Sequence, residues 1–268
     1  MRKSLKRISA MFLRYLYLHK RSLPRTFEIF FWPVMDLFVW GFVAVYIQGF
    51  AVDALSRIIV YLINALIFWD ILYRSQQGVS ISFVEDMWTQ NIVNILVSPL
   101  RIWEWHTATF IYGTVKSLII MLILSVIAFF LYRFNLIAAT GFYLIPLVGN
   151  LFLFGWALGV ATSGLIIRYG HAAEALIWGI PFLIQPVSAV FYPLSVLPVW
   201  VQLLSKLLTS TYVFEGMRSV IATGAMPWRF TVTAFALNVA YFILGSLFFQ
   251  KMFEKSRETG RLGHLGLD

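Results

Sequence analysis

The sequence predicts an all-α membrane protein that crosses a bilayer six times, and three observations lead to this fold class. Of the 268 residues, 60% are hydrophobic and only 12% are charged, whereas a soluble domain carries about 25% charged residues. Charge-free runs recur along the chain, each near the ~20 residues that a transmembrane helix needs. The apolar–polar alternation of membrane β-strands is missing. A soluble globule is therefore excluded, and the aromatic content of 18% excludes a disordered chain.

Residues 1–25 predict a helix that lies in the cytoplasmic membrane interface. Its apolar residues recur at helical spacing, namely Leu5, Ile8, Phe12, Tyr15 and Leu16. Lysines and arginines fill much of the remaining surface, and the helix is expected to stop near Pro24. No apolar run precedes Phe27, so we do not expect a cleavable signal. A basic anchor that only sets the topology is the alternative.

Six apolar segments then follow as predicted spans. They are Ile29–Ile47, Ile58–Tyr73, Thr107–Leu131, a stretch within Phe134–Ile167, a segment that begins at Ala175, and Phe230–Phe249. The fifth is interrupted by Pro181, Pro186, Pro193 and Pro198. Since each proline removes a backbone donor, we expect a broken helix to about Tyr192 and a re-entrant outer segment over 193–212. A seventh span through Leu194–Leu208 is the alternative.

The distribution of positive charge favours six spans with both termini in the cytoplasm. Lysines and arginines gather at the two ends of the chain, and such residues are retained on the cytoplasmic side of a membrane. Seven spans would place Lys251, Lys255, Arg257 and Arg261 outside, against this rule. We therefore expect a multi-pass protein of a bacterial inner (cytoplasmic) membrane. The net charge of +9 fits anionic lipid at these ends rather than nucleic acid.

Motifs of catalysis are missing. The chain has no GxxxxGK[ST] loop for phosphate, no HExxH pair and no cysteine. We expect no catalytic, cofactor-binding or metal-binding residues and no enzyme activity in this chain.

Three ionisable residues, Asp36, Asp70 and Lys116, fall inside predicted spans. A charge at the centre of a bilayer costs about 2.5–3.5 kcal/mol, so such residues are candidates for function. We predict that Asp36 or Asp70 pairs with Lys116. The alternatives are a pair that only locks packing, or a Lys116 that reaches to the inner interface.

Gly155 and Gly159 form a GxxxG motif, which allows close packing of helices. The partner is either another helix of this chain, which we favour, or a second subunit.

Residues 78–100 predict a cytoplasmic amphipathic helix between spans two and three. Apolar residues repeat at steps of three and four, namely Val84, Met87, Trp88, Ile92, Ile95 and Leu96. Acidic and amide residues, among them Glu85 and Asp86, fill the other face. An acidic, aromatic helix fits a groove on a soluble partner. A helix that lies on the membrane surface is the alternative, although such helices are usually basic.

The chain resembles the permease subunits of ABC transporters of the type-2 exporter class. The resemblance rests on the basic N-terminal helix with six spans, on the loop ending Val97-Ser98-Pro99-Leu100, and on the segment Gln185–Pro193 (QPVSAVFYP) with its continuation to Tyr212. The chain departs from the family at Trp88–Asn91, where Gly-Thr-Leu-Glu is frequent. It departs again at Thr209–Thr211, where the usual Asn-Pro is missing.

This resemblance implies a half-transporter that exports a drug, a lipid or a lipid-linked glycan. Two permeases, identical or related, would pair and dock separate ATPase subunits, which hold ATP and Mg²⁺. It implies docking contacts at Glu85, Asp86 and Trp88. It also implies an outer re-entrant gate formed by Tyr192, Pro193, Pro198, Glu215 and Arg218, in which Glu215 and Arg218 can pair on one helical turn. A structural or assembly protein without transport, and a membrane-embedded enzyme acting on lipid, are the competing functions.

Overall fold

The computed structural model describes residues 2–48, 58–260 and 262, and over these ranges the regular elements are all helices. The α-helices are α1 (Arg2–Lys20), α2 (Leu23–Gln48), α3 (Ile58–Trp88), α4 (Ile92–Val97), α5 (Ile102–Tyr132), α6 (Leu136–Thr140), α7 (Leu144–Tyr169), α8 (Leu176–Ile184), α9 (Val199–Ser205), α10 (Thr209–Thr223) and α11 (Trp228–Glu258). Short 3₁₀ turns are η2 (Gly141–Tyr143), η3 (Gly170–Ala173), η4 (Gln185–Val187) and η5 (Leu194–Val196). The predicted all-α class is confirmed.

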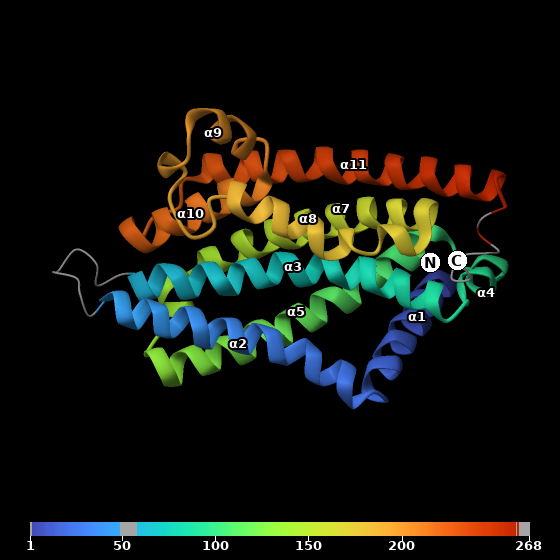
Figure 1. Ribbon diagram of the computed structural model, residues 1–268, viewed down its shortest axis with the longest axis horizontal. Helices are drawn as coiled ribbons and strands as arrows, with labels where there is room; N and C mark the ends of the chain where they lie inside the picture. Colours follow the sequence, from blue (N-terminus) through green and yellow to red (C-terminus); the bar gives the residue numbers. More distant parts are fainter. Residues whose placement is uncertain (1, 49–57, 261, 263–268) are drawn as a thin grey trace.

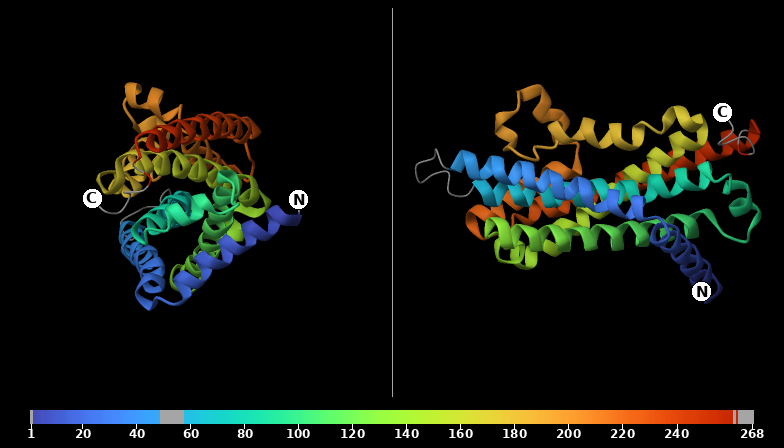
Figure 2. Two further views of the ribbon diagram at one scale, coloured as in Figure 1. Left: turned by 90° about the vertical axis from the view of Figure 1, so that its right-hand side faces the viewer. Right: turned by 60° about the horizontal axis from the view of Figure 1, so that its bottom comes forward.

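The long helices α2, α3, α5, α7 and α11 run side by side along the molecule (Figure 1). Helices α1 and α4 lie at one end, together with the C-terminal end of α11, and we call this the basic end because α1 and α11 both finish with basic residues. Helices α6, α9 and α10 lie at the opposite end. Figure 2 shows α1 leaving the bundle at an angle.

Four described helices are long and apolar enough to cross a membrane: Thr26–Ile47, Ile102–Tyr132, Leu136–Ala173 and Trp228–Glu258. They correspond to the predicted spans one, three, four and six. Helix α3 is as long as α5, at 31 residues, but polar residues such as Asp70, Arg74 and Gln77 interrupt its apolar sequence. The fifth segment holds a shorter apolar helix, Leu176–Val187. Six spans therefore remain a prediction at α3 and α8.

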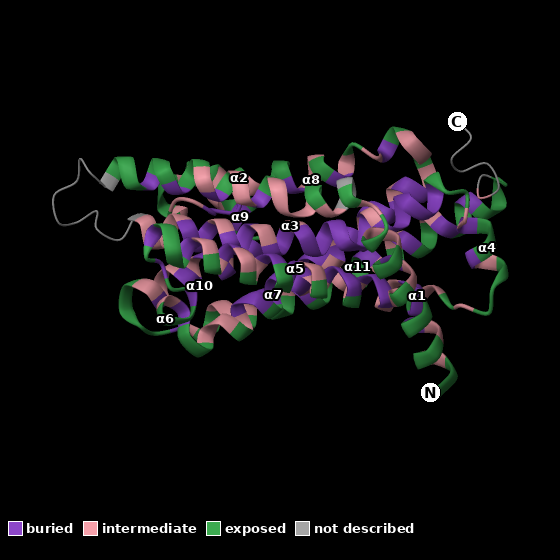
Figure 3. Cartoon of the chain, turned by 90° about the horizontal axis from the view of Figure 1, so that it is seen from below, coloured by how far each residue is buried: buried purple, intermediate pink, exposed green. Residues whose placement is uncertain are grey.

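Helix α3 is the central helix of the bundle. It packs against α2, α5, α7 and α8, and Figure 3 shows buried residues concentrated along it. Ile63, Ile67 and Ile71 are fully buried. Because α3 is surrounded by other helices, it can carry polar residues that a lipid-facing helix could not.

Two glycines of α7 allow it to approach α3 closely. A Cβ built on Gly155 would lie 2.8 Å from the carbonyl oxygen of Leu72, and one on Gly159 would lie 2.9 Å from that of Gln76. Such contacts are shorter than side-chain carbons adopt. The GxxxG motif thus packs within the chain, which was the favoured interpretation.

The prediction of a separate helix over 78–100 is wrong in its boundaries. Helix α3 continues through Gly78 to Trp88, because Gly78 packs on Gly113 of α5 and does not break the helix. The chain turns at Thr89–Asn91, with Gln90 at φ 52°, and then forms the short helix α4. Ser98 and Pro99 end α4 as the sequence predicts.

Regular helix in the fifth segment ends earlier than predicted, since α8 stops at Ile184 and a 3₁₀ turn follows to Val187. Pro193 and Pro198 adopt extended backbone before η5 and α9. The stretch Leu194–Leu208 is not one continuous helix, so the alternative of a seventh span there is wrong. Pro198, which adopts extended backbone within this stretch, is the physical reason.

Candidate functional site: a cavity between α2, α3 and α8

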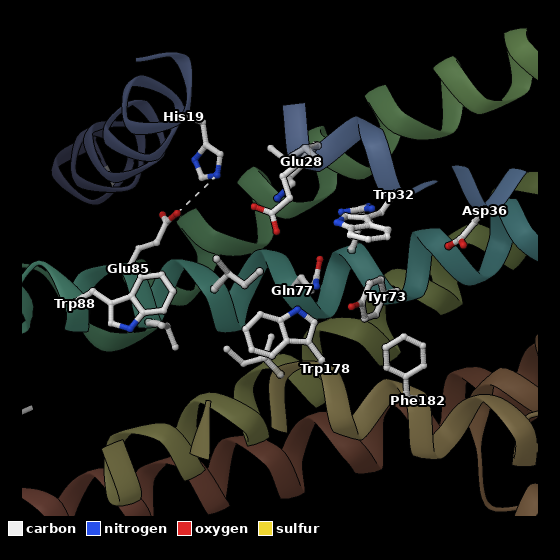
Figure 4. A pocket seen from close by; sticks show the side chains of 16 residues that line it. His19, Glu28, Trp32, Asp36, Tyr73, Gln77, Glu85, Trp88, Trp178 and Phe182 are labelled. Carbon is white, nitrogen blue, oxygen red and sulfur yellow. Dashed lines mark ion pairs between the residues drawn. The ribbon is translucent and has the colours of Figure 1, made fainter. Parts of the chain in front are cut away.

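A cavity of about 590 Å³ lies between α2, α3 and α8, with α1 near the basic end and one residue of α5 reaching in (Figure 4). Its aromatic lining consists of Trp32, Tyr73, Trp88, Trp178 and Phe182. Its ionisable lining consists of His19, Glu28, Asp36, Arg74, Glu85 and Lys116. The space therefore combines large apolar rings with charges of both signs.

Helical spacing explains why these side chains share one space. On α3, Tyr73, Gln77 and Ile81 lie four residues apart, so one face of that helix forms the floor. On α8, Trp178 and Phe182 have the same spacing and form one wall. Figure 4 shows Trp178 and Phe182 on the opposite side of α3 from α2. The ring centroids of Tyr73 and Phe182 are 5.9 Å apart.

Helix α2 forms the other wall with Glu28, Trp32 and Asp36, again four residues apart. The Trp32 side chain is 60% exposed and that of Trp178 is 42% exposed. The Trp32 ring meets the ring of Phe31 edge to face, with centroids 5.4 Å apart, and much of its surface stays open. This side of the molecule thus presents exposed aromatic and acidic groups to whatever occupies the cavity.

Two of the three predicted intramembrane charges line this cavity, and the third lines the space beside it. Asp36 and Lys116 line the cavity, and Asp70 and Asp36 line a neighbouring space of about 170 Å³. The predicted pair with Lys116 is wrong. Among the described residues, no ion pair joins Lys116 to Asp36 or Asp70, whereas Asp70 accepts from Arg74 Nε at 3.1 Å. Arg74 lies one turn from Asp70 on the same helix, so it reaches that carboxylate without any movement of α5.

The predicted docking residue Asp86 contacts α1 within the chain. Its carboxylate is fully buried, accepts a hydrogen bond from Tyr15 Oη at 2.7 Å and pairs with Arg14 at 2.5 Å. Trp105 Nε1 donates to the same Tyr15 hydroxyl at 2.7 Å. Burial raises the pKa of Asp86, and the Arg14 guanidinium opposes that shift. Asp86 therefore joins the end of α3 to α1.

A second carboxylate, that of Glu104 at the start of α5, binds α1 closer to the N-terminus of that helix. It accepts from Arg7 Nε at 2.7 Å and from Ser4 Oγ at 2.5 Å. The sequence predicted that the lysines and arginines of this helix fill its polar surface, but Arg7 and Arg14 pair with buried carboxylates of the bundle. The apolar face of α1 was predicted in part, because Ile8 and Tyr15 are buried while Leu5 is 64% exposed.

The three predicted docking residues therefore differ in accessibility. Glu85 is buried with one oxygen 3.8 Å from His19 Nε2, and Asp86 is buried as described. Trp88 is 47% exposed and donates from Nε1 to Glu174 Oε1 at 2.8 Å. The docking role of these residues stays a prediction, and exposure favours Trp88 together with α4.

At the opposite end, the predicted pair of Glu215 and Arg218 is confirmed, with Arg218 Nη2 2.9 Å from Glu215 Oε1. The same Glu215 oxygen accepts from the backbone N–H of Leu194 at 2.7 Å. Arg218 also donates to the carbonyl of Ala189 at 2.6 Å, and Tyr192 Oη donates to the carbonyl of Pro186. The bonds of Glu215 and Arg218 hold the proline-rich segment against α10, and the Tyr192 bond lies within that segment.

Comparison with known families identifies the fold. Residues 16–222 match the sequence profile of the ABC-2 type transporter, which covers most of the chain. The chain belongs to the ABC-2 type transporter family. This membrane domain is a permease with several apolar helices and lacks ATPase activity of its own. The family works with ATPases in general, and its members are multi-pass membrane proteins. No curated protein matches this ABC-2 permease.

Proposed function

We propose that this permease is the transmembrane subunit of an ATP-driven exporter and that the cavity between α2, α3 and α8 belongs to its translocation pathway. The observation that carries the proposal is the exposed carboxylate of Asp36 in the middle of an apolar helix. A charge in contact with hydrocarbon costs about 2.5–3.5 kcal/mol. A water-filled pathway or a second subunit removes that cost.

Two copies, or two related permeases, would pair so that the open side of each cavity is covered. The exposed rings of Trp32 and Trp178 and the charge of Asp36 all lie on this open side. A substrate that suits both rings and charges is an amphiphile, and a drug, a lipid or a lipid-linked glycan meets this description.

The basic end faces the cytoplasm of a bacterial cell in this proposal, with six spans and both chain ends on that side. The basic residues of α1 and of the end of α11 support the orientation. The opposite end, with α9 and the segment fastened by Glu215 and Arg218, then forms an outer gate together with Tyr192, Pro193 and Pro198.

Separate ATPase subunits would bind at α4 and at the exposed ring of Trp88. Val93 and Val97 of α4 are exposed at the basic end, as a docking contact requires. A displacement of this region by the ATPase would be transmitted to α1 through the contacts of Asp86 and Glu104. The interfacial helix and the cavity floor on α3 would therefore move together.

Affinity purification of the full chain in mild detergent, followed by identification of bound subunits, tests this function. We expect a nucleotide-binding ATPase to co-purify and to hydrolyse ATP in reconstituted vesicles. Asp36→Asn is expected to change the ATPase rate, whereas Gln250→Ala, on the exposed surface of α11, should not. A chain that purifies without any ATPase would favour the competing function of a structural or assembly protein.

A further inference from the structure

One hydrogen bond lies at the basic end of the cavity, where it involves the lining residue Trp88. Trp88, at the last turn of α3, donates from Nε1 to Glu174 Oε1 at 2.8 Å. Glu174 lies just before α8, between η3 and the first turn of that helix. The bond therefore joins a residue of the cavity floor on α3 to the chain just before α8.

Helical spacing places both partners in line with the cavity. Trp178 and Phe182 lie four residues apart and share one side of α8. Glu174 precedes Trp178 by four residues in the turn before α8, with backbone angles in the helical region. Trp88 follows Glu85 and Ile81 along the cavity face of α3. In Figure 4, Trp88 lies at the end of the cavity that is farthest from Asp36 and Phe182.

The carboxylate of Glu174 is also held from its own side. His171 Nδ1 lies 2.5 Å from the same Oε1 atom, three residues earlier in the chain. This contact fixes the carboxylate where the indole N–H reaches it. The Trp88 ring is half-exposed and the bond is open to solvent, so it can break and re-form without opening the buried core.

We propose that the Trp88–Glu174 bond is a latch that closes the basic end of the cavity between α3 and α8. The inference rests on the proposed export function, in which substrate enters from the cytoplasm. Trp88 is also a predicted docking contact, so an ATPase that binds its ring would act on the latch directly. Opening the latch separates α8 from the end of α3 and admits an amphiphile to the rings of Trp178 and Trp32.

Thiol labelling of the permease alone tests the latch, and the natural chain contains no cysteine. Ile81→Cys places a single thiol on the cavity floor. Its reaction with a membrane-impermeant maleimide is measured from the cytoplasmic side of inverted vesicles. Trp88→Phe removes the N–H but keeps an aromatic ring. We expect it to raise the labelling rate about tenfold, the size of effect expected when a hydrogen bond to a charged acceptor is lost from the closed state.

Trp103→Phe is the matched control, because Trp103 is an exposed tryptophan at the same end that does not line the cavity. It should leave the labelling rate unchanged. Glu174→Ala should reproduce the effect of Trp88→Phe and serves as a second variant if the first folds poorly. Equal labelling rates in all three variants and the parent would overturn the latch.

Cross-linking supplies the converse test in the complex with its ATPase. A Trp88→Cys, Glu174→Cys pair joined by a short bifunctional methanethiosulfonate, which forms a disulfide with each thiol and releases sulfinate, holds the latch closed. We expect ATP hydrolysis to fall to background and to recover on reduction. The control pair Arg168→Cys and Thr259→Cys joins α7 to α11, where Arg168 Nη1 donates to Thr259 Oγ1, and should leave hydrolysis intact.

The two tests separate the latch from the proposed function. If the cross-linked Trp88–Glu174 pair hydrolyses ATP as fast as the reduced pair, the latch is wrong while the exporter stands. If no ATPase binds the chain, the exporter is wrong, and the labelling rates still report whether the bond closes the cavity.

Discussion

Replacing both packing glycines of α7 by alanine should weaken the contact between α7 and α3. Cβ atoms at positions 155 and 159 would lie 2.8 and 2.9 Å from backbone carbonyl oxygens of α3. Backbone cannot rotate away as a side chain can, so the helices must separate. Overpacking costs about 1–3 kcal/mol per site, and alanine returns about 1 kcal/mol per site through helix propensity. We therefore expect Gly155→Ala with Gly159→Ala to lose about 2 kcal/mol of unfolding free energy.

Gly149→Ala is the matched control on the same helix, because a Cβ there meets no atom within 4 Å. It should be neutral or stabilise the protein by up to about 1 kcal/mol. Equilibrium unfolding in mixed detergent and dodecyl sulfate micelles, followed by tryptophan fluorescence, measures both variants. A double variant as stable as Gly149→Ala would refute the close approach of α7 to α3.

The remaining predictions concern the charges. Asp86→Asn leaves Arg14 without its buried partner and should reduce protection of α1 against hydrogen exchange by about 2 kcal/mol. Unchanged protection of α1 would contradict a stabilising contact between Asp86 and this helix. Lys116→Met should abolish the stimulation of ATP hydrolysis by an anionic amphiphile. It should not lower the melting temperature, because it removes the cost of about 2.5–3.5 kcal/mol for placing a charge in the membrane. A lower melting temperature together with full stimulation would indicate that this lysine is purely structural. Arg218→Lys, which cannot make the forked contact, should speed exchange at the Leu194 amide about tenfold, and a rate equal to that of the parent would count against the fastening of this segment.

Several features of the structure could be predicted from local patterns in the sequence. The all-α class follows from long apolar runs, the Glu215–Arg218 pair follows from spacing on one turn, and the GxxxG motif identifies the close-packed face of α7. In each case the interacting residues are near in sequence, or the signal is a property of one helix.

The missed features depend on residues far apart in the sequence. Arg7 and Arg14 look like surface charges until Glu104 and Asp86 are brought against α1 by the packing of α5 and α3. The continuation of α3 past Gly78 depends on Gly113 of another helix. The Asp70–Arg74 pair was missed, although the position of Arg74 four residues after Asp70 on one helix could have predicted it.

Site-specific photocross-linking from the basic end tests the central claim most directly. A photoreactive residue at Val97, which is highly exposed on α4, should form a cross-link to a phosphate-loop ATPase in intact cells, and one at Leu203 on α9 should not. Cross-links to an ATPase from Leu203, or from neither position, would contradict a permease that receives its energy at α4.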